Sequence, residues 1–142
     1  LEISILGCLL IFIIFNDEKY KEIPIWINLA LFSWVITFGY ELIENNFLPA
    51  LYLAFALMLI YLLFLKVRRV EGLGLADIIL LFSISLYLGF PDFLYLITIA
   101  SASLLIKIIL TQKLKEPHAF GSWIAGTFGV FILFQEFYVS AN

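Results

Sequence analysis

The chain has 142 residues, of which 64% are hydrophobic and only 13% are charged, and its formal net charge is −3. Soluble domains carry about 25% charged residues, so this composition excludes that class and predicts an integral membrane protein in a lipid bilayer. A single cysteine, Cys8, excludes a disulfide framework and a cysteine zinc cluster within the chain, and the acidic balance gives no reason to expect a nucleic-acid partner.

Six apolar runs follow one another along the chain, and they predict an all-α polytopic membrane protein with about six transmembrane helices. The runs cover residues 3–15, 24–42, 48–65, 77–90, 94–111 and 120–138. A spanning helix needs about 20 residues, so the first and fourth runs are short. The runs lack the alternation of polar and apolar residues that an outer-membrane barrel requires.

The four prolines support this division, because each lies at or just before a predicted helix start, where a missing backbone N–H costs least. They are Pro24, Pro49, Pro91 and Pro117. The first run lacks the basic segment and the small-residue cleavage site of a signal peptide. With no linker, low-complexity tract or clear repeat, residues 1–142 are expected to form a single domain.

Basic residues concentrate in alternate loops of this arrangement. Loops 1, 3 and 5 hold Lys19, Lys21, Lys66, Arg68, Arg69, Lys113 and Lys115, whereas loops 2 and 4 hold no Lys or Arg. The positive-inside rule therefore predicts that the odd loops face the cytoplasm and that both termini lie outside. Lys107, near the end of the fifth predicted helix, is expected to extend its ammonium to the interface.

Two aspartates lie on the same predicted side. Asp17 follows the first run, and Asp77 begins the fourth, so packing of the helices could bring their carboxylates together. Two adjacent carboxylates can hold one proton between them and activate water for amide hydrolysis. Two simpler interpretations remain open: solvated charges at the membrane interface, or, for Asp77, a helix N-cap.

The sequences around the two acids are more specific. In "DEKYKEIPIW", Asp17 precedes Pro24 by seven residues, and in "GLGLAD", Gly72 and Gly74 precede Asp77. Together these segments resemble the motifs of the type IV prepilin peptidase family of membrane aspartic proteases of the GxGD type. Ala76 stands where that motif has its last glycine.

This resemblance implies a membrane aspartic endopeptidase in which Asp17 and Asp77 are catalytic and Pro24, Gly72, Gly74 and Ala76 belong to the substrate or motif loops. It implies cleavage of the leader peptide from type IV pilin-like precursors at the cytoplasmic face of the cytoplasmic (inner) membrane. The lysine often found after the second aspartate is missing, and so is the cysteine-rich zinc module of larger members. No cofactor and no metal site are expected.

Two alternatives use the same residues differently. A small six-helix transporter or scaffold would use Asp17 and Asp77 for proton or cation handling, although transport carboxylates are expected near the membrane midplane. An inactive relative would bind pilin-like helices without cutting them.

The last predicted helix carries small residues at every fourth position. Gly121, Ala125 and Gly129 form a stripe on which another helix is expected to pack closely.

Overall fold

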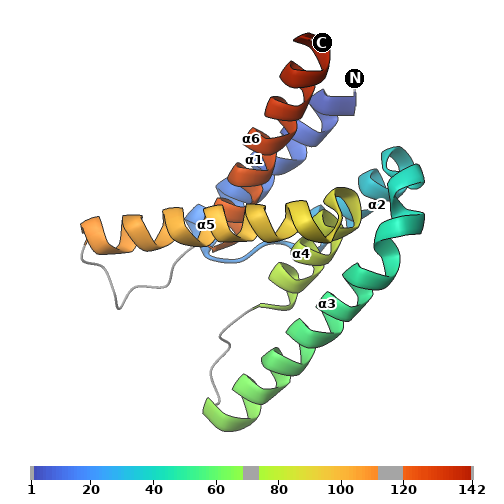
Figure 1. Cartoon of the computed structure of the whole chain (residues 1–142). Coiled ribbons are helices and arrows are strands. Elements are labelled where there is room, and N and C mark those ends of the chain that lie inside the picture. Colours follow the sequence, from blue (N-terminus) through green and yellow to red (C-terminus); the bar gives the residue numbers. More distant parts are fainter. Residues whose placement is uncertain (1, 69–73, 112–119, 142) are drawn as a thin grey trace.

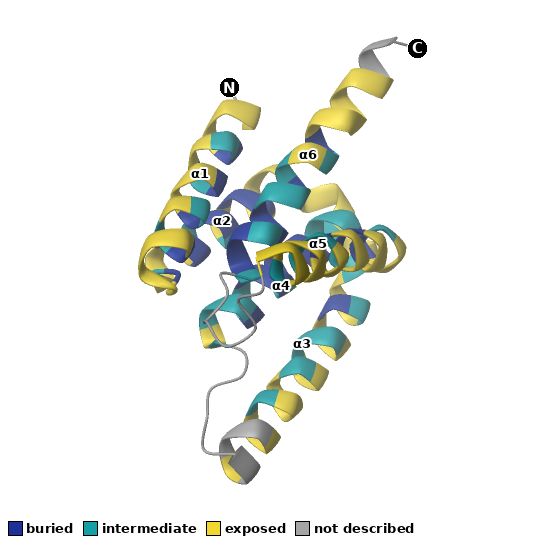
Figure 2. Ribbon diagram, turned by 90° about the vertical axis from the view of Figure 1, so that its left-hand side faces the viewer, coloured by how far each residue is buried: buried dark blue, intermediate teal, exposed yellow. Residues whose placement is uncertain are grey.

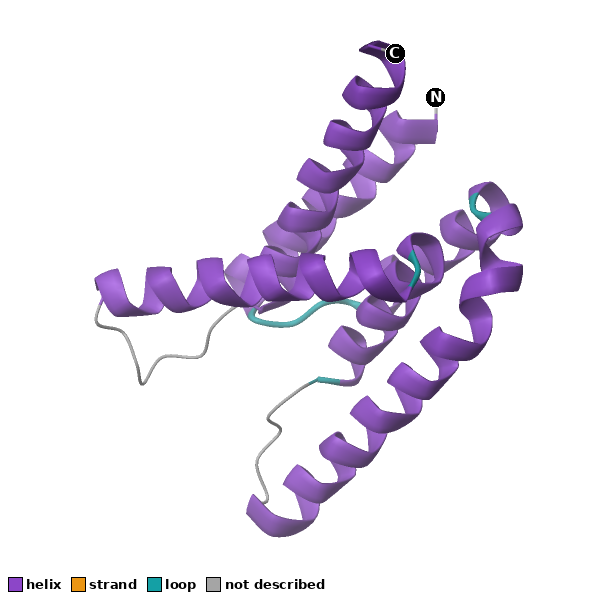
Figure 3. Ribbon diagram, viewed as in Figure 1, coloured by secondary structure: helices purple, strands orange, loops and turns teal. Residues whose placement is uncertain are grey.

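The computed structural model describes residues 2–68, 74–111 and 120–141, and within these ranges the regular structure is entirely α-helical, as predicted (Figures 1 and 3). The helices are α1 (Glu2–Tyr20), α2 (Ile25–Phe38), α3 (Tyr40–Arg68), α4 (Leu75–Leu88), α5 (Phe90–Thr111) and α6 (Phe120–Ala141).

The helices pack in two groups of three. In one group α1 and α5 both pack against α6, and α1 and α6 lie side by side with the chain termini at the same end (Figure 1). In the other group α2, α3 and α4 pack on one another. The groups meet through α1 with α2, through α4 with α5 and α6, and through α3 with α5. Figure 2 shows that buried positions concentrate toward the middle of the bundle. Leu31, Ile84 and Phe128 are fully buried in this core.

Large apolar side chains cover much of the outer surface, as expected for a protein in contact with lipid. Phe55, Leu110 and Phe134 are each more than 60% exposed. Among the described residues, three helical segments are long and apolar enough to cross a bilayer, namely Tyr40–Leu63, Phe90–Thr111 and Phe120–Tyr138. These segments support a membrane protein, whereas six spans are not confirmed: α2 and α4 have only 14 residues each, and α5 runs across α1 and α6 (Figure 1).

The predicted boundary between the second and third helices is wrong. Residues 43–47 do not form a loop, because α2 ends at Phe38 and Gly39 alone separates it from α3. Pro49 therefore lies inside α3, where its missing N–H and its ring cause a bend (Figure 1). Asn46 helps to hold this part of the helix, since its side-chain amide donates a hydrogen bond of 3.0 Å to the carbonyl of Leu86 on α4.

The other prolines in the described ranges lie where they were predicted, with Pro24 as the N-cap of α2 and Pro91 in the first turn of α5. Pro117 lies outside the described residues.

The small residues of α6 pack as expected. Ala125 is fully buried, and a Cβ atom on Gly129 would lie 3.3 Å from a methyl group of Leu10 on α1. Because Gly129 has no side chain, α1 packs closely against α6 at this point.

Gly89, between α4 and α5, should not tolerate a side chain. Its backbone has φ 80° and ψ 165°, a conformation essentially confined to glycine, and a Cβ atom would lie 2.8 Å from Oδ1 of Asn46. We expect Gly89→Ala to lower the free energy of unfolding in detergent by about 1–3 kcal/mol. Gly7→Ala is the control, because a Cβ atom there meets nothing within 4 Å. Equal stability of the two variants would contradict this assignment.

Candidate functional site

Asp17 lies inside α1, not after it as the sequence suggested, because the helix continues to Tyr20. Its side chain is turned inward and is only 5% exposed. The backbone N–H of Ser122, in the first turn of α6, donates a hydrogen bond to Oδ2 of Asp17. The N-terminus of a helix favours a negative charge, so α6 stabilises the ionised form of this acid.

Asp77 is the third residue of α4, and the N-cap is Gly74, so the interpretation of Asp77 as the N-cap is wrong. Its carboxylate instead reaches back to the start of the helix, where Oδ2 accepts a hydrogen bond of 3.2 Å from the backbone N–H of Gly74. This leaves Oδ1 directed toward another element.

The two carboxylates meet at Gly121 in the first turn of α6. A Cβ atom placed on Gly121 would lie 3.1 Å from Oδ1 of Asp77, 3.2 Å from Oδ2 of Asp17 and 2.4 Å from Cδ1 of Ile23. The structure therefore brings the two predicted acids together, and only a residue without a side chain fits between them. From the sequence, Gly121 was expected only to pack against another helix.

Burial dominates the electrostatics of this pair, and both acids lie outside the three candidate membrane spans. Burial raises the pKa of Asp77 from 3.8 to about 6. The hydrogen bond from the Gly74 N–H opposes this shift, and the negative charge of Asp17 adds to it. Burial also raises the pKa of Asp17, but the Ser122 N–H and the ammonium of Lys21 oppose this shift. Asp77 is accordingly the acid that retains a proton more readily.

The motif residues near Asp77 have distinct positions. Ala76 is helical with an ordinary negative φ, since among the described residues only Lys21 and Gly89 have positive φ, so alanine is compatible with this backbone. Its carbonyl accepts a hydrogen bond of 2.7 Å from the side-chain amide of Asn28, which is fully buried on α2. Pro24 is the N-cap of α2, the helix that carries Asn28. Gly72 lies outside the described residues.

Asn28 was missed from the sequence. The only available signal was a single amide in the largely apolar run 24–42. A buried amide requires hydrogen-bond partners, and Asn28 obtains one by fixing the start of α4 beside α2.

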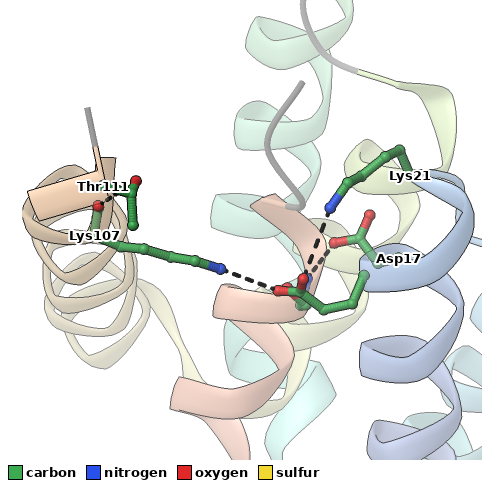
Figure 4. Close-up of polar contacts among 6 residues, drawn as sticks. Asp17, Lys21, Lys107 and Thr111 are labelled. Atoms are coloured by element: carbon green, nitrogen blue, oxygen red, sulfur yellow. Dashed lines mark hydrogen bonds and ion pairs between the residues drawn. The ribbon is translucent and has the colours of Figure 1, made fainter. Parts of the chain in front are cut away.

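Glu18 forms a second cluster beside Asp17. Its carboxylate accepts a hydrogen bond of 3.1 Å from the hydroxyl of Ser122 and pairs with Lys107 at 3.5 Å and Lys21 at 3.7 Å. Figure 4 shows Lys107 reaching from α5 and Lys21 from the end of α1 toward this carboxylate. Although partial burial alone would raise the pKa of Glu18, the Ser122 hydroxyl and the two ammonium groups lower it. Lys107, expected only to extend to the interface, also lies over the ring of Trp123 at 5.3 Å.

This arrangement is chemically suited to acid–base catalysis. Two carboxylates beside one glycine, with unequal environments, can share one proton, so that one acts as a base while the other donates. Among the described residues, no three His, Cys, Asp or Glu side chains are grouped as metal ligands.

A sequence profile of the type IV leader peptidase family matches residues 4–111. This range contains both aspartates, α1 except its first two residues, and α2 to α5, whereas Gly121 and Ser122 lie beyond it. Among curated proteins and among solved structures, none matches this chain.

The raised pKa of Asp77 predicts how stability depends on pH. Because its folded-state pKa of about 6 exceeds the ordinary 3.8, ionisation is costly in the folded protein, and the penalty grows between pH 4 and 6 and is complete above pH 6. Asp77→Asn removes this penalty while its amide oxygen can still accept from Gly74. We expect the variant to be more stable than the wild type at pH 7.5, by on the order of 2 kcal/mol, and equally stable at pH 3.5.

Thermal unfolding in detergent at the two pH values measures this effect. Asp92→Asn is the control, since Asp92 is also an acid in the first turn of a helix that follows a glycine. A gain for Asp77→Asn that is the same at both pH values would contradict the proposed penalty.

Proposed function

The chain belongs to the type IV leader peptidase family, and on this premise we propose that it is an aspartic endopeptidase that uses Asp17 and Asp77. The observation that carries the proposal is the position of both carboxylates on the same side of Gly121, where an added Cβ atom would lie 3.1 Å from Asp77 and 3.2 Å from Asp17. An aspartic peptidase needs one group that activates water and one that polarises the scissile carbonyl, and the two carboxyl groups can supply both.

The two acids have different roles in the proposed reaction. Asp77, with the higher pKa, carries the shared proton and donates a hydrogen bond to the scissile carbonyl oxygen. Asp17, whose charge is stabilised by the Ser122 N–H, takes a proton from the attacking water. The new C–O bond gives a tetrahedral intermediate. As this collapses, the C–N bond breaks and the proton held by Asp17 passes to the leaving amine, which leaves one proton on the pair.

The proposed substrate is a type IV pilin-like precursor, cut between its basic leader and its apolar helix. The family supports this substrate class. The location of the site near the ends of α1 and α4 supports cleavage at a membrane face, and the basic residues Lys19, Lys21, Lys66 and Arg68 support the cytoplasmic one.

The transporter interpretation has less support. Asp17 and Asp77 lie outside the three candidate spans found among the described residues, whereas a transported proton or cation needs ionisable groups near the midplane.

Replacing either aspartate should abolish cleavage. Asparagine keeps the shape of the side chain but neither takes up nor supplies the proton, so we expect Asp17→Asn and Asp77→Asn each to lower kcat by at least about a hundredfold. Because the acids act as one unit, the double variant should lose no more than either single variant. The measurement is cleavage of a pilin-like precursor by purified protein, with Asp92→Asn as the control. In the wild type, kcat/KM should fall as pH rises through about 6, where Asp77 ionises. Cleavage by either single variant at the rate of the control would remove that acid from the mechanism.

The proposed orientation is tested by labelling. In a background without Cys8, a cysteine at Lys66 should react with an impermeant reagent only after the cytoplasmic side is opened, and one at Glu2 should react from outside. Labelling of both positions from one side would contradict the proposed topology.

A further inference from the structure

A groove lies on α6 between α1 and α5. The described residues of α1 and α5 have no Cα atoms within 8 Å of each other, although both helices pack against α6. The groove has a volume of about 470 Å³, with Ser122, Gly126 and Val130 on its floor and Ile14 and Ile99 among its walls.

The floor of the groove is suited to a helix. A Cβ atom on Gly126 would meet nothing within 4 Å, so this position is open to close approach from outside. Small residues in a membrane helix allow a second helix to pack closely, and Gly126 lies in the span Phe120–Tyr138. A peptide bound at this depth must satisfy its own backbone hydrogen bonds, which requires a helix.

One end of the groove is polar and adjoins the acid pair. Glu18 and Ser122 line it there, and the Ser122 N–H binds Asp17. The pair between Glu18 and Lys107 joins the α1 side of the groove to the α5 side, with both side chains more than 40% exposed. Exposed ion pairs are weak, so an incoming cation can replace Lys107 at Glu18.

These features fit one occupant. Resting on the proposed function, we propose that the groove binds the apolar helix of the pilin-like precursor, with the basic segment that precedes this helix at Glu18. The peptide bonds at the junction of the two segments then lie beside Asp17, which explains how a protease with an exposed apolar surface selects one junction.

The first test fills the groove. A precursor with a basic leader and an apolar helix of about 20 residues is compared with a short peptide that contains only the junction. We expect Gly126→Leu to raise KM for the precursor about tenfold and to leave cleavage of the short peptide unchanged. Gly7→Leu is the matched control, because Gly7 is also helical with nothing within 4 Å of a Cβ atom but lies outside the groove. Equal effects of the two variants on the precursor, or a loss on both substrates, would overturn the inference.

The second test does not depend on cleavage. A photo-cross-linker at Val130, 57% exposed in the groove, should capture the apolar helix of the precursor in liposomes, whereas one at Phe55, 65% exposed on α3, should not. Cross-linking from Val130 without any cleavage would support the groove and refute the protease. Cleavage of the precursor, with cross-links from Val130 only to lipid or to a second copy of the chain, would support the protease and refute binding of the substrate helix in the groove.

Discussion

The burial of two carboxylates against one glycine is the constraint on which the rest of the structure depends. Removing an acid from water is costly unless hydrogen bonds or charges compensate, and each aspartate receives one backbone N–H from a helix N-terminus. Those donors lie at the start of α4, which begins at Leu75, and in the first turn of α6, which begins at Phe120. The helix boundaries, the glycine between the acids and the close packing of α6 against α1 therefore serve one small polar site in an apolar protein.

The cost of burying the two carboxylates is only partly compensated, and this leaves the two acids with different proton affinities. Asp77 has one backbone donor and a negative neighbour, so its pKa stays raised to about 6, whereas Asp17 has the Ser122 N–H and the nearby Lys21. Two acids of the same type are thus made unequal by their surroundings, as acid–base catalysis requires. Glu18 and its two lysines add charge next to the pair, at the position where the basic segment of a substrate is proposed to bind.

The sequence predicted the helical class and the membrane environment, because composition determines these. It also predicted that Asp17 and Asp77 could lie together, as they do at Gly121, and their catalytic role stays a prediction. It failed where tertiary contacts decide. Pro49 resembled a helix start, but the hydrogen bond from Asn46 to α4 holds a bent helix through it. Gly121 was interpreted only as a packing residue. Its position beside Asp17 and Asp77 could not be predicted, because it brings together segments that are far apart in the chain. Asn28 belongs to no recognisable sequence motif. Its hydrogen bond to the carbonyl of Ala76 becomes evident only from the packing of α2 beside α4.

The division of the helices into two groups places the acids on separate bodies. Asp17 belongs to the group of α1, α5 and α6, and Asp77 belongs to the group of α2, α3 and α4. Each acid also takes its backbone donor from its own group, Ser122 from the first and Gly74 from the second. A small rigid-body shift between the groups would therefore change the separation of the carboxylates, and with it their ability to share a proton, without breaking either hydrogen bond. The ability of the pair to share a proton is therefore sensitive to how closely the two groups of helices pack.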